Sequence, residues 1–320
     1  MHDDLSIMAV STPIRPAAAT ATAIAPAPSP SPYYRRTVMA LALLIVLVPA
    51  VALFPGTSHG ALTAGLHAGF TTTQLVIFLA VAVIAGAVKG LSGFGYALIA
   101  TPLAAVLIDP SVAVIVLAVP ALMMNLFQVG ETGTGWRYLR QYWQLVAAAL
   151  VGSAIGVFVL TRLPAKPVLS VAIGVLLLGY VAWSVLRRGK PAARSAHPVA
   201  LGTIGVVEGI LLGAVNMGPL LPAYLHSFER DARRYIGGMS LVFTLVFAER
   251  IGQMLANGLM TPHLLWLGSV IALVTLVGLV AGTAIRRGGH VNATVFSVVV
   301  LGLLTVTGVI MLVKALPHLL

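Results

Sequence analysis

Residues 88–102 read VKGLSGFGYALIATP, in which Lys89 precedes Gly90, Gly93 and Gly95 between apolar runs that are typical of membrane segments. Glycine weakens a helix interior and permits backbone conformations that other residues avoid. A lysine in the middle of a bilayer costs at least about 2.5 kcal/mol unless it is paired or solvated. A helix that breaks beside a charge at membrane depth therefore predicts a functional site. It also constrains the membrane topology of the rest of the chain.

The composition of the 320 residues is that of an integral membrane protein, with 59% hydrophobic residues, 8% charged residues and a mean hydropathy of +1.02. Apolar segments that approach or reach about 20 residues can cross a bilayer as helices, and lipid offers no partner to open backbone groups. The absence of cysteine excludes disulfides and thiolate sites, and no metal or cofactor is expected. The apolar segments are 37–54, 111–129, 141–160, 168–186, 236–256, 264–283 and 293–312.

The net charge of +11 is concentrated in a few loops. The positive-inside rule makes these loops cytoplasmic and makes 55–73 and 257–262, which have no Lys or Arg, external. Loop 161–167, with Arg162 and Lys166, is an exception. A basic chain of this kind reports membrane topology rather than nucleic-acid binding. The basic clusters are Arg35 and Arg36; Arg137 and Arg140; Arg187, Arg188, Lys190 and Arg194; Arg230, Arg233 and Arg234; and Arg286 and Arg287.

Two further apolar regions complete this topology only if they are broken, re-entrant helical hairpins. Region 74–107 must enter from outside and return there, and region 199–226 must enter from the cytoplasm and return there. Each contains two apolar pieces of about 10–15 residues, too short to span comfortably, around a glycine-rich break. The chain is then expected to have a cytoplasmic N-terminus and an external C-terminus in the cytoplasmic (inner) membrane.

An internal repeat relates the two hairpins and the helices that follow them. Each half reads as one broken hairpin plus three transmembrane helices, and an odd number of crossings inverts the second half relative to the first. Inverted repeats with broken helices are typical of secondary transporters. A shift of 123 positions pairs Gly86 with Gly209, Gly90 with Gly213, Gly95 with Gly218 and Trp143 with Trp266, and three further positions pair Gly152 with Gly278 and Gly156 with Gly282.

The predicted fold is therefore an all-α integral membrane protein with four regions. Residues 1–34, rich in Ala, Pro, Ser and Thr, are expected to form a disordered cytoplasmic tail. Residues 35–56 are expected to be an extra N-terminal transmembrane helix that is retained rather than cleaved as a signal. Residues 74–187 and 198–313 are the two inverted-topology repeats.

The hairpins predict an anion site near the membrane midplane. The second half-helices begin near Tyr96 and Pro219, and a helix start presents unpaired N–H groups and about half a positive charge. Backbone contacts are expected from Gly93, Gly95, Asn216 and Gly218, charge from Lys89 and Arg250, and hydrogen bonds from Ser92, Asn125 and Gln128. Glu208 or Glu249 is expected to couple protons.

Structural alternatives accompany these assignments. Gly86 and Gly90 form a small-xxx-small pair that would allow close helix packing. Asn125 and Gln128 are equally suited to hydrogen bonds between helices. Lys89 and Arg250 could instead snorkel to the interface or form ion pairs with Glu208 or Glu249. A neutral buried carboxyl at Glu208 would look identical in sequence.

Two motifs resemble those of a known family. GLSGFGYALIATPL at 90–103 and GAVNMGPLLPAYL at 213–225 resemble the glycine-rich and Gly-Pro breaks of the TauE/SafE family of sulfite and organosulfur-anion exporters, and the resemblance covers about 70–313. The sequence differs in having Tyr96 and Asn216 where glycine is expected. The resemblance implies export of sulfite, sulfoacetate or a related small anion, whereas the residues themselves indicate only a small anion.

Two other functions use some of the same residues. A passive anion channel would use the same helix ends and cations. Gly90 to Gly93 spell GxSG, which resembles the nucleophile motif of rhomboid intramembrane proteases, but no histidine is placed at similar depth to act as the base. A transporter without enzymatic activity is therefore favoured. Its expected partners are a small anion, the lipid bilayer and protons as the candidate coupling ion.

Overall fold

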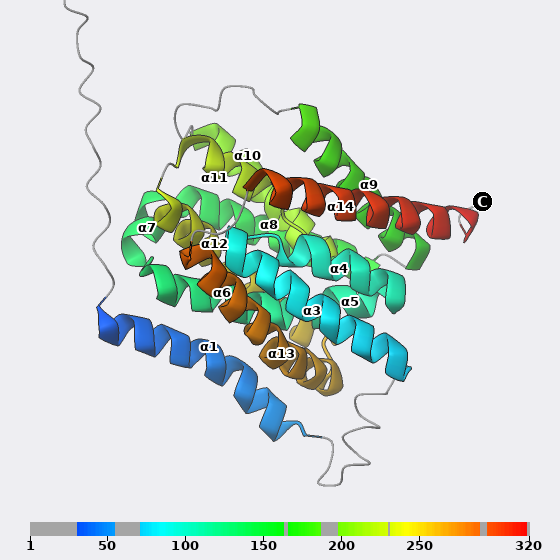
Figure 1. Ribbon diagram of the computed structural model, residues 1–320, viewed down its shortest axis with the longest axis horizontal. Coiled ribbons are helices and arrows are strands. Elements are labelled where there is room, and N and C mark those ends of the chain that lie inside the picture. The colour runs from blue at the N-terminus through cyan, green and yellow to red at the C-terminus, as the bar shows by residue number, and fades with distance from the viewer. Residues whose placement is uncertain are drawn as a thin grey trace, which may run out of the picture.

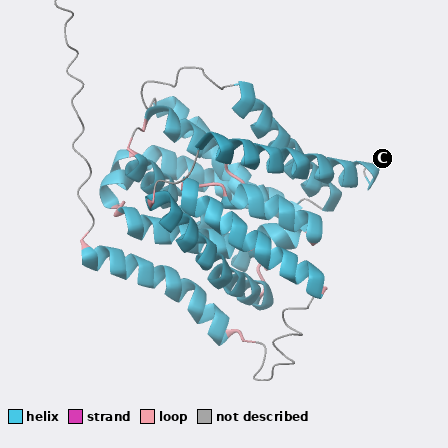
Figure 2. Ribbon diagram, viewed as in Figure 1, coloured by secondary structure: helices cyan, strands magenta, loops and turns pink. Residues whose placement is uncertain are grey.

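The computed structural model describes residues 31–54, 71–162, 166–186, 198–229, 231–288 and 293–318, and this part of the chain contains helices and no strand (Figures 1 and 2). The predicted N-terminal tail lies outside it except for its last residues. The helices are α1 (Pro32–Ala52), α3 (Thr72–Ser92), α4 (Tyr96–Leu107), α5 (Pro110–Val116), α6 (Ala118–Thr132), α7 (Trp136–Gln141), α8 (Trp143–Arg162), α9 (Lys166–Leu186), α10 (Pro198–Val215), α11 (Leu220–Phe228), α12 (Ala232–Ala256), α13 (Pro262–Arg287) and α14 (Ala293–Ala315).

The chain is a multi-pass membrane protein. Within the described ranges, 8 helical segments are long and apolar enough to cross a bilayer, namely α1, α3, α5 with α6, α8, α9, α10, α12 and α13. Large apolar side chains such as Val76, Phe158 and Val277 are exposed on the outer faces, where lipid would cover them. The seven apolar segments expected from the sequence fall on α1, α5 with α6, α8, α9, α12, α13 and α14.

The first hairpin is formed by α3 and α4. The side-chain nitrogen Nε2 of Gln74, at the start of α3, donates to the carbonyl of Leu107, at the end of α4, at 2.8 Å. The two outer ends of the pair therefore lie together, and α4 runs back beside α3 (Figure 1). Helices α10 and α11 form the corresponding pair in the second half of the chain.

The first helix of each pair is longer than expected. Helices α3 and α10 have 21 and 18 residues, and only α4 and α11, with 12 and 9, are short. The expectation of two short pieces is thus wrong for the first helix, because a helical glycine costs only about 1 kcal/mol and the helix continues through Gly86 and Gly90. It ends at Gly93, whose φ of 86° is left-handed.

The second break has a matching backbone feature without glycine. Asn216 has a φ of 62° and is the one non-glycine residue with positive φ in the described part. Asparagine is among the few residues that tolerate this region. The shift of 123 that pairs the two hairpins places Asn216 on Gly93, so both first helices end at left-handed residues.

Glycines bring two pairs of helices into close contact, α3 with α13 and α10 with α8. A Cβ atom on Gly86 would lie 2.6 Å from the carbonyl oxygen of Thr275 in α13, and one on Gly205 would lie 2.7 Å from that of Leu145 in α8. Gly90 meets the backbone of α13 in the same way. The close-packing interpretation of Gly86 and Gly90 is therefore confirmed.

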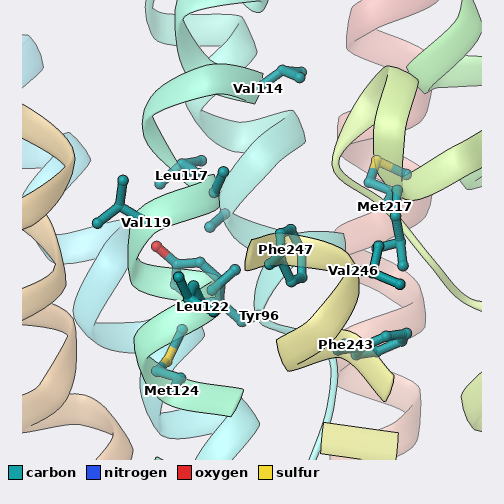
Figure 3. Close-up of a cluster of buried hydrophobic side chains, with 14 of the residues drawn as sticks. Tyr96, Val114, Leu117, Val119, Leu122, Met124, Met217, Phe243, Val246 and Phe247 are labelled. Carbon is teal, nitrogen blue, oxygen red and sulfur yellow. The ribbon is translucent and has the colours of Figure 1, made fainter. Parts of the chain in front are cut away.

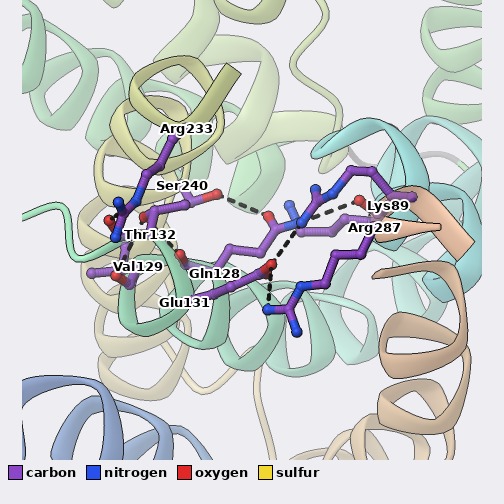
Figure 4. A network of polar contacts seen from close by, with 9 residues as sticks. Lys89, Gln128, Val129, Glu131, Thr132, Arg233, Ser240 and Arg287 are labelled. Carbon is purple, nitrogen blue, oxygen red and sulfur yellow. Dashed lines mark hydrogen bonds and ion pairs between the residues drawn. The ribbon is translucent and has the colours of Figure 1, made fainter. Parts of the chain in front are cut away.

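Arg233, Arg286 and Arg287 lie at one end of the helix bundle, which we call the arginine end. Glu131, at the end of α6, accepts from Nη2 of Arg286 at 2.8 Å and of Arg287 at 3.1 Å, both at the end of α13. Arg233, at the start of α12, donates to the carbonyl of Thr132 at 2.9 Å. Three helix ends therefore meet there (Figure 4).

Helix α1 corresponds to the extra helix expected at 35–56 and packs against α6 and α13. Its first turn lies at the arginine end, because the hydroxyl of Tyr34 donates to the carbonyl of Thr134 at 2.6 Å. Its far end places Phe54 against Trp266 at the start of α13, with 6.4 Å between the ring centroids. The helix therefore runs the length of the bundle (Figure 1).

Candidate functional site

The two breaks meet at a small cavity inside the bundle. Its volume is about 30 Å³, and its lining includes Lys89 of α3, Gly95 and Tyr96 at the start of α4, Asn125 of α6 and Gly218 of the second break. Aromatic side chains of α12, Phe243 and Phe247, line it as well. Figure 3 shows these two rings in the buried cluster that also contains Tyr96. A space of this volume holds one or two waters.

Lys89 places an amino group at the cavity that has no carboxylate partner among the described residues. Its side chain is 3% exposed, and its amino group Nζ donates to Oδ1 of Asn125 at 2.8 Å and to the carbonyl of Gly93 at 3.3 Å. Both acceptors are neutral, and Lys89 has no ion pair with any described residue. In this part of the chain Lys89 therefore does not form the alternative ion pair with Glu208 or Glu249. An amino group without a carboxylate partner makes the cavity favourable for an anion.

The start of α4 adds a second source of positive potential. The cap residue Gly95 has a φ of 94° and offers no side chain to the helix end. The first backbone bond of the helix runs from the N–H of Ile99 to the carbonyl of Gly95 at 3.2 Å. The N–H groups of the first turn, Tyr96 to Leu98, come before this bond and therefore have no carbonyl partner within the helix. The same turn lines the cavity.

The start of α11 is different, because a carboxyl group of the protein caps it. Oε2 of Glu208, in α10, accepts from the N–H of Leu220 at 2.9 Å. Glu208 is 0% exposed, and a Cβ on Gly218 would lie 2.5 Å from its other oxygen. One half-helix end is open to the cavity, and the other is capped by a carboxyl group of the protein.

Sequence reasoning missed this asymmetry although a signal was present. The shift of 123 that aligns the glycines places Glu208 on Ala85, which has no polar group. A carboxyl that is present in only one of two matched hairpins, about two turns before the break, could have been recognised as a candidate cap.

Arg250 lies beside the second break but is not among the residues that line the cavity. It is 0% exposed. Its guanidinium donates from Nε to the carbonyl of Gly213 at 3.2 Å, from Nη2 to that of Val114 at 3.3 Å, and from Nη1 to Oδ1 of Asn216. Nδ2 of Asn216 in turn donates to the hydroxyl of Thr101 at 2.9 Å. Arg250 and Asn216 thus connect the second break to α4 and α5.

Other predicted residues form a layer behind the cavity. Nε2 of Gln128 donates to the carbonyl of Lys89 at 3.3 Å, and its Oε1 accepts from the hydroxyl of Ser240 at 2.9 Å. Gly93 packs against Ile236, since a Cβ there would lie 2.6 Å from Cγ1 of that residue. These contacts join α3, α6 and α12 next to the site (Figure 4).

Ser92 and Glu249 lie away from the cavity lining. The hydroxyl of Ser92 is within hydrogen-bond distance of two carbonyls, that of Val88 at 2.8 Å and that of Phe94 at 2.7 Å. It has no histidine partner in the described residues, and His263 instead packs against Trp266 with ring centroids 6.0 Å apart. Glu249 is half-buried on the face of α12 next to Arg250.

Of the predicted site residues, the structure thus brings Lys89, Gly95, Asn125 and Gly218 to the cavity. The aromatic residues Phe243 and Phe247 were not predicted. Their spacing of four residues on α12 is also that of ordinary core packing, so no sequence signal separates a cavity-lining role from a packing role.

Comparison with known proteins gives one match. A family model described as sulfite exporter TauE/SafE matches residues 77–311. No curated protein and no solved structure matches the chain. The match includes every residue of the cavity and both breaks, and α1 precedes it.

Proposed function

The chain belongs to the sulfite exporter TauE/SafE family of membrane transporters, and from this premise we propose that it is a secondary transporter that exports a small sulfur-containing anion. Sulfite, sulfoacetate and related organosulfonates are the proposed substrates, and the cytoplasmic membrane is the proposed location. The observation that supports this most directly is the buried cavity at which both helix breaks meet, with the unpaired Lys89 beside it.

The proposed binding mode uses three features of that cavity. The anion would lie between the amino group of Lys89 and the open first turn of α4, where charge and N–H donors converge. Gly95 and Gly218 would allow the anion to approach the backbone. Asn125 would hold Lys89 in place, because its Oδ1 accepts from the lysine and its Nδ2 donates to the carbonyl of Ala121 at 2.8 Å.

Alternating access between two inverted repeats, 74–187 and 198–313, is the proposed mechanism. Support comes from the reciprocal packing of the halves, in which α3 of the first packs on α13 of the second, and α10 of the second packs on α8 of the first. Under the shift that pairs the glycines, α8 corresponds to α13 and α3 to α10. Each half therefore packs one helix against a helix of the other half. A cavity between two halves arranged in this way is suited to rocking of one half against the other.

The proposed orientation places the arginine end in the cytoplasm. The start of α1 lies at that end through Tyr34, and α14 ends on the opposite side of the bundle (Figure 1). This arrangement supports a cytoplasmic N-terminus and an external C-terminus.

Flux measurements in liposomes test the function. The purified protein would be reconstituted, and uptake of labelled sulfite, sulfate and sulfoacetate would be measured with and without a pH gradient. Saturable uptake of a sulfur anion that responds to the gradient is expected. Non-saturating flux that follows voltage alone would establish a passive channel instead, and the absence of anion flux would refute the proposal.

A further inference from the structure

We propose that Lys89 itself is the proton-coupling group of this transporter, neutral when the cavity is empty and protonated when an anion is bound. Each anion would then bind together with one proton. This inference rests on the proposed function, since it requires that the cavity binds an anion. It differs from coupling through Glu208 or Glu249, the two carboxyl groups that the sequence suggested.

The surroundings of Lys89 suit a neutral amine as well as an ammonium. A neutral amine still has N–H groups to donate, so the bond of 2.8 Å to Oδ1 of Asn125 does not require the charge. The side chain is 3% exposed and has neutral acceptors alone. A buried lysine of this kind is the type that loses its proton readily.

An anion in the cavity would favour the protonated form of Lys89 over the neutral form. Lys89 and the first turn of α4 line the same small space, so the bound anion would lie next to the amino group. Attraction between opposite charges is strong where water is excluded, and a nearby negative charge favours the protonated lysine. The anion therefore recruits the proton, and the pair crosses with less net charge than the anion alone.

The other ionisable groups on the surrounding helices have partners or lie elsewhere. Glu208 caps α11 through Leu220, Arg250 donates to three acceptors, and Glu131 is paired with two arginines at the arginine end. Tyr96 is the other ionisable residue in the cavity lining. The ionisable groups on the elements that surround Lys89 are Tyr96 on α4; Glu131 on α6; Glu208 on α10; Arg233, Arg234, Tyr235, Glu249 and Arg250 on α12; and His263, Arg286 and Arg287 on α13.

Binding of sulfoacetate provides a clean test, because its acid groups stay ionised above pH about 6. Any proton taken up on binding must then come to the protein. If Lys89 gains one proton with the anion, the affinity falls as the pH rises, by up to tenfold per pH unit. Sulfite is less suitable as the probe because it titrates near neutrality itself.

The experiment is titration calorimetry of the full-length protein in detergent, in two buffers with different ionisation enthalpies. The wild type is expected to take up about one proton per sulfoacetate. Lys89→Arg, whose side chain keeps its charge, is expected to bind with no proton uptake and little pH dependence, whereas Lys89→Met loses binding. Glu208→Gln and Glu249→Gln are expected to keep proton uptake per bound anion.

Each contrary outcome has a distinct meaning. Binding by the wild type without proton uptake, or uptake that persists in Lys89→Arg, would overturn the role of Lys89. Loss of proton uptake in Glu208→Gln or Glu249→Gln would show that the replaced carboxyl, and not Lys89, takes up the proton. This comparison of the two glutamine variants with the wild type still tests the proposal if Lys89→Arg does not give a monodisperse protein. Absence of both sulfoacetate and sulfite binding by the wild type would overturn the proposed function itself.

Discussion

Replacement of Arg250 tests whether this residue holds the anion or holds the second helix break. In the structure its guanidinium donates to the carbonyls of Gly213 and Val114 and to Asn216. Leaving a buried acceptor without its donor costs about 1–3 kcal/mol. Three such losses, partly offset because a buried charge is also removed, give about 3 kcal/mol or more for Arg250→Ala.

Arg250→Lys is expected to be at least as destabilising as Arg250→Ala. A lysine keeps a buried charge but lacks the planar fork that reaches three acceptors in different directions. At about 2–4 °C per kcal/mol, both variants should unfold roughly 6–12 °C below the wild type. If Arg250 neutralised the anion instead, Arg250→Lys would retain part of the transport and most of the stability.

Thermal unfolding in detergent and sulfite uptake in liposomes are the two assays for these variants. Arg137→Ala is the matched control, because Arg137 is exposed on α7, and it should change neither measurement. An Arg250→Ala protein that unfolds within about 2 °C of the wild type while uptake is abolished would refute the interpretation that Arg250 holds the second helix break. That result would return Arg250 to the anion site.

Three substitutions of glycine test the rest of the geometry. Gly95→Leu should abolish sulfite binding in calorimetry, because it fills the approach to α4 and strains a left-handed residue by about 1–2 kcal/mol; wild-type binding would contradict the placement of the anion. Gly86→Ala should lower the unfolding temperature through an overpacking cost of about 1–3 kcal/mol, whereas Gly179→Ala, which has open space around it, should not, and equal effects would refute close packing with α13. Gly218→Ala should displace Glu208 from the start of α11 and lower the sulfite uptake rate, and unchanged uptake would show that the cap is dispensable.

The membrane class and the position of the breaks could be predicted because they depend on local sequence. Apolar length gives the spans, and left-handed backbone at Gly93 and Gly95 is a conformation that glycine adopts without a steric cost. The length of α3 could not be predicted in the same way. Gly86 and Gly90 resemble break residues in sequence, and only the backbone of α13 against them makes them packing residues.

The site was predictable in part for the same reason. Lys89 is next to the break in sequence, so its place at the cavity follows from local structure. Arg250 and Asn216 are 34 positions apart and bond to each other, and the partner of Asn216 is Thr101, 115 positions away. Whether Lys89 or Arg250 lines the cavity depends on these long-range contacts, and hydropathy and spacing contain no information about them.

The asymmetry between the two half-helix ends supports the proposal that the cavity binds one anion. Two open ends that meet at one cavity would each favour a negative charge. The carboxyl group of Glu208 already satisfies the start of α11 through Leu220, whereas Ala85, at the matching position in the first half, leaves the start of α4 open. The proposed single exchangeable anion at α4, beside the carboxyl cap of α11, rests on that one difference in sequence, which would give the proposed repeats unequal roles within a similar backbone.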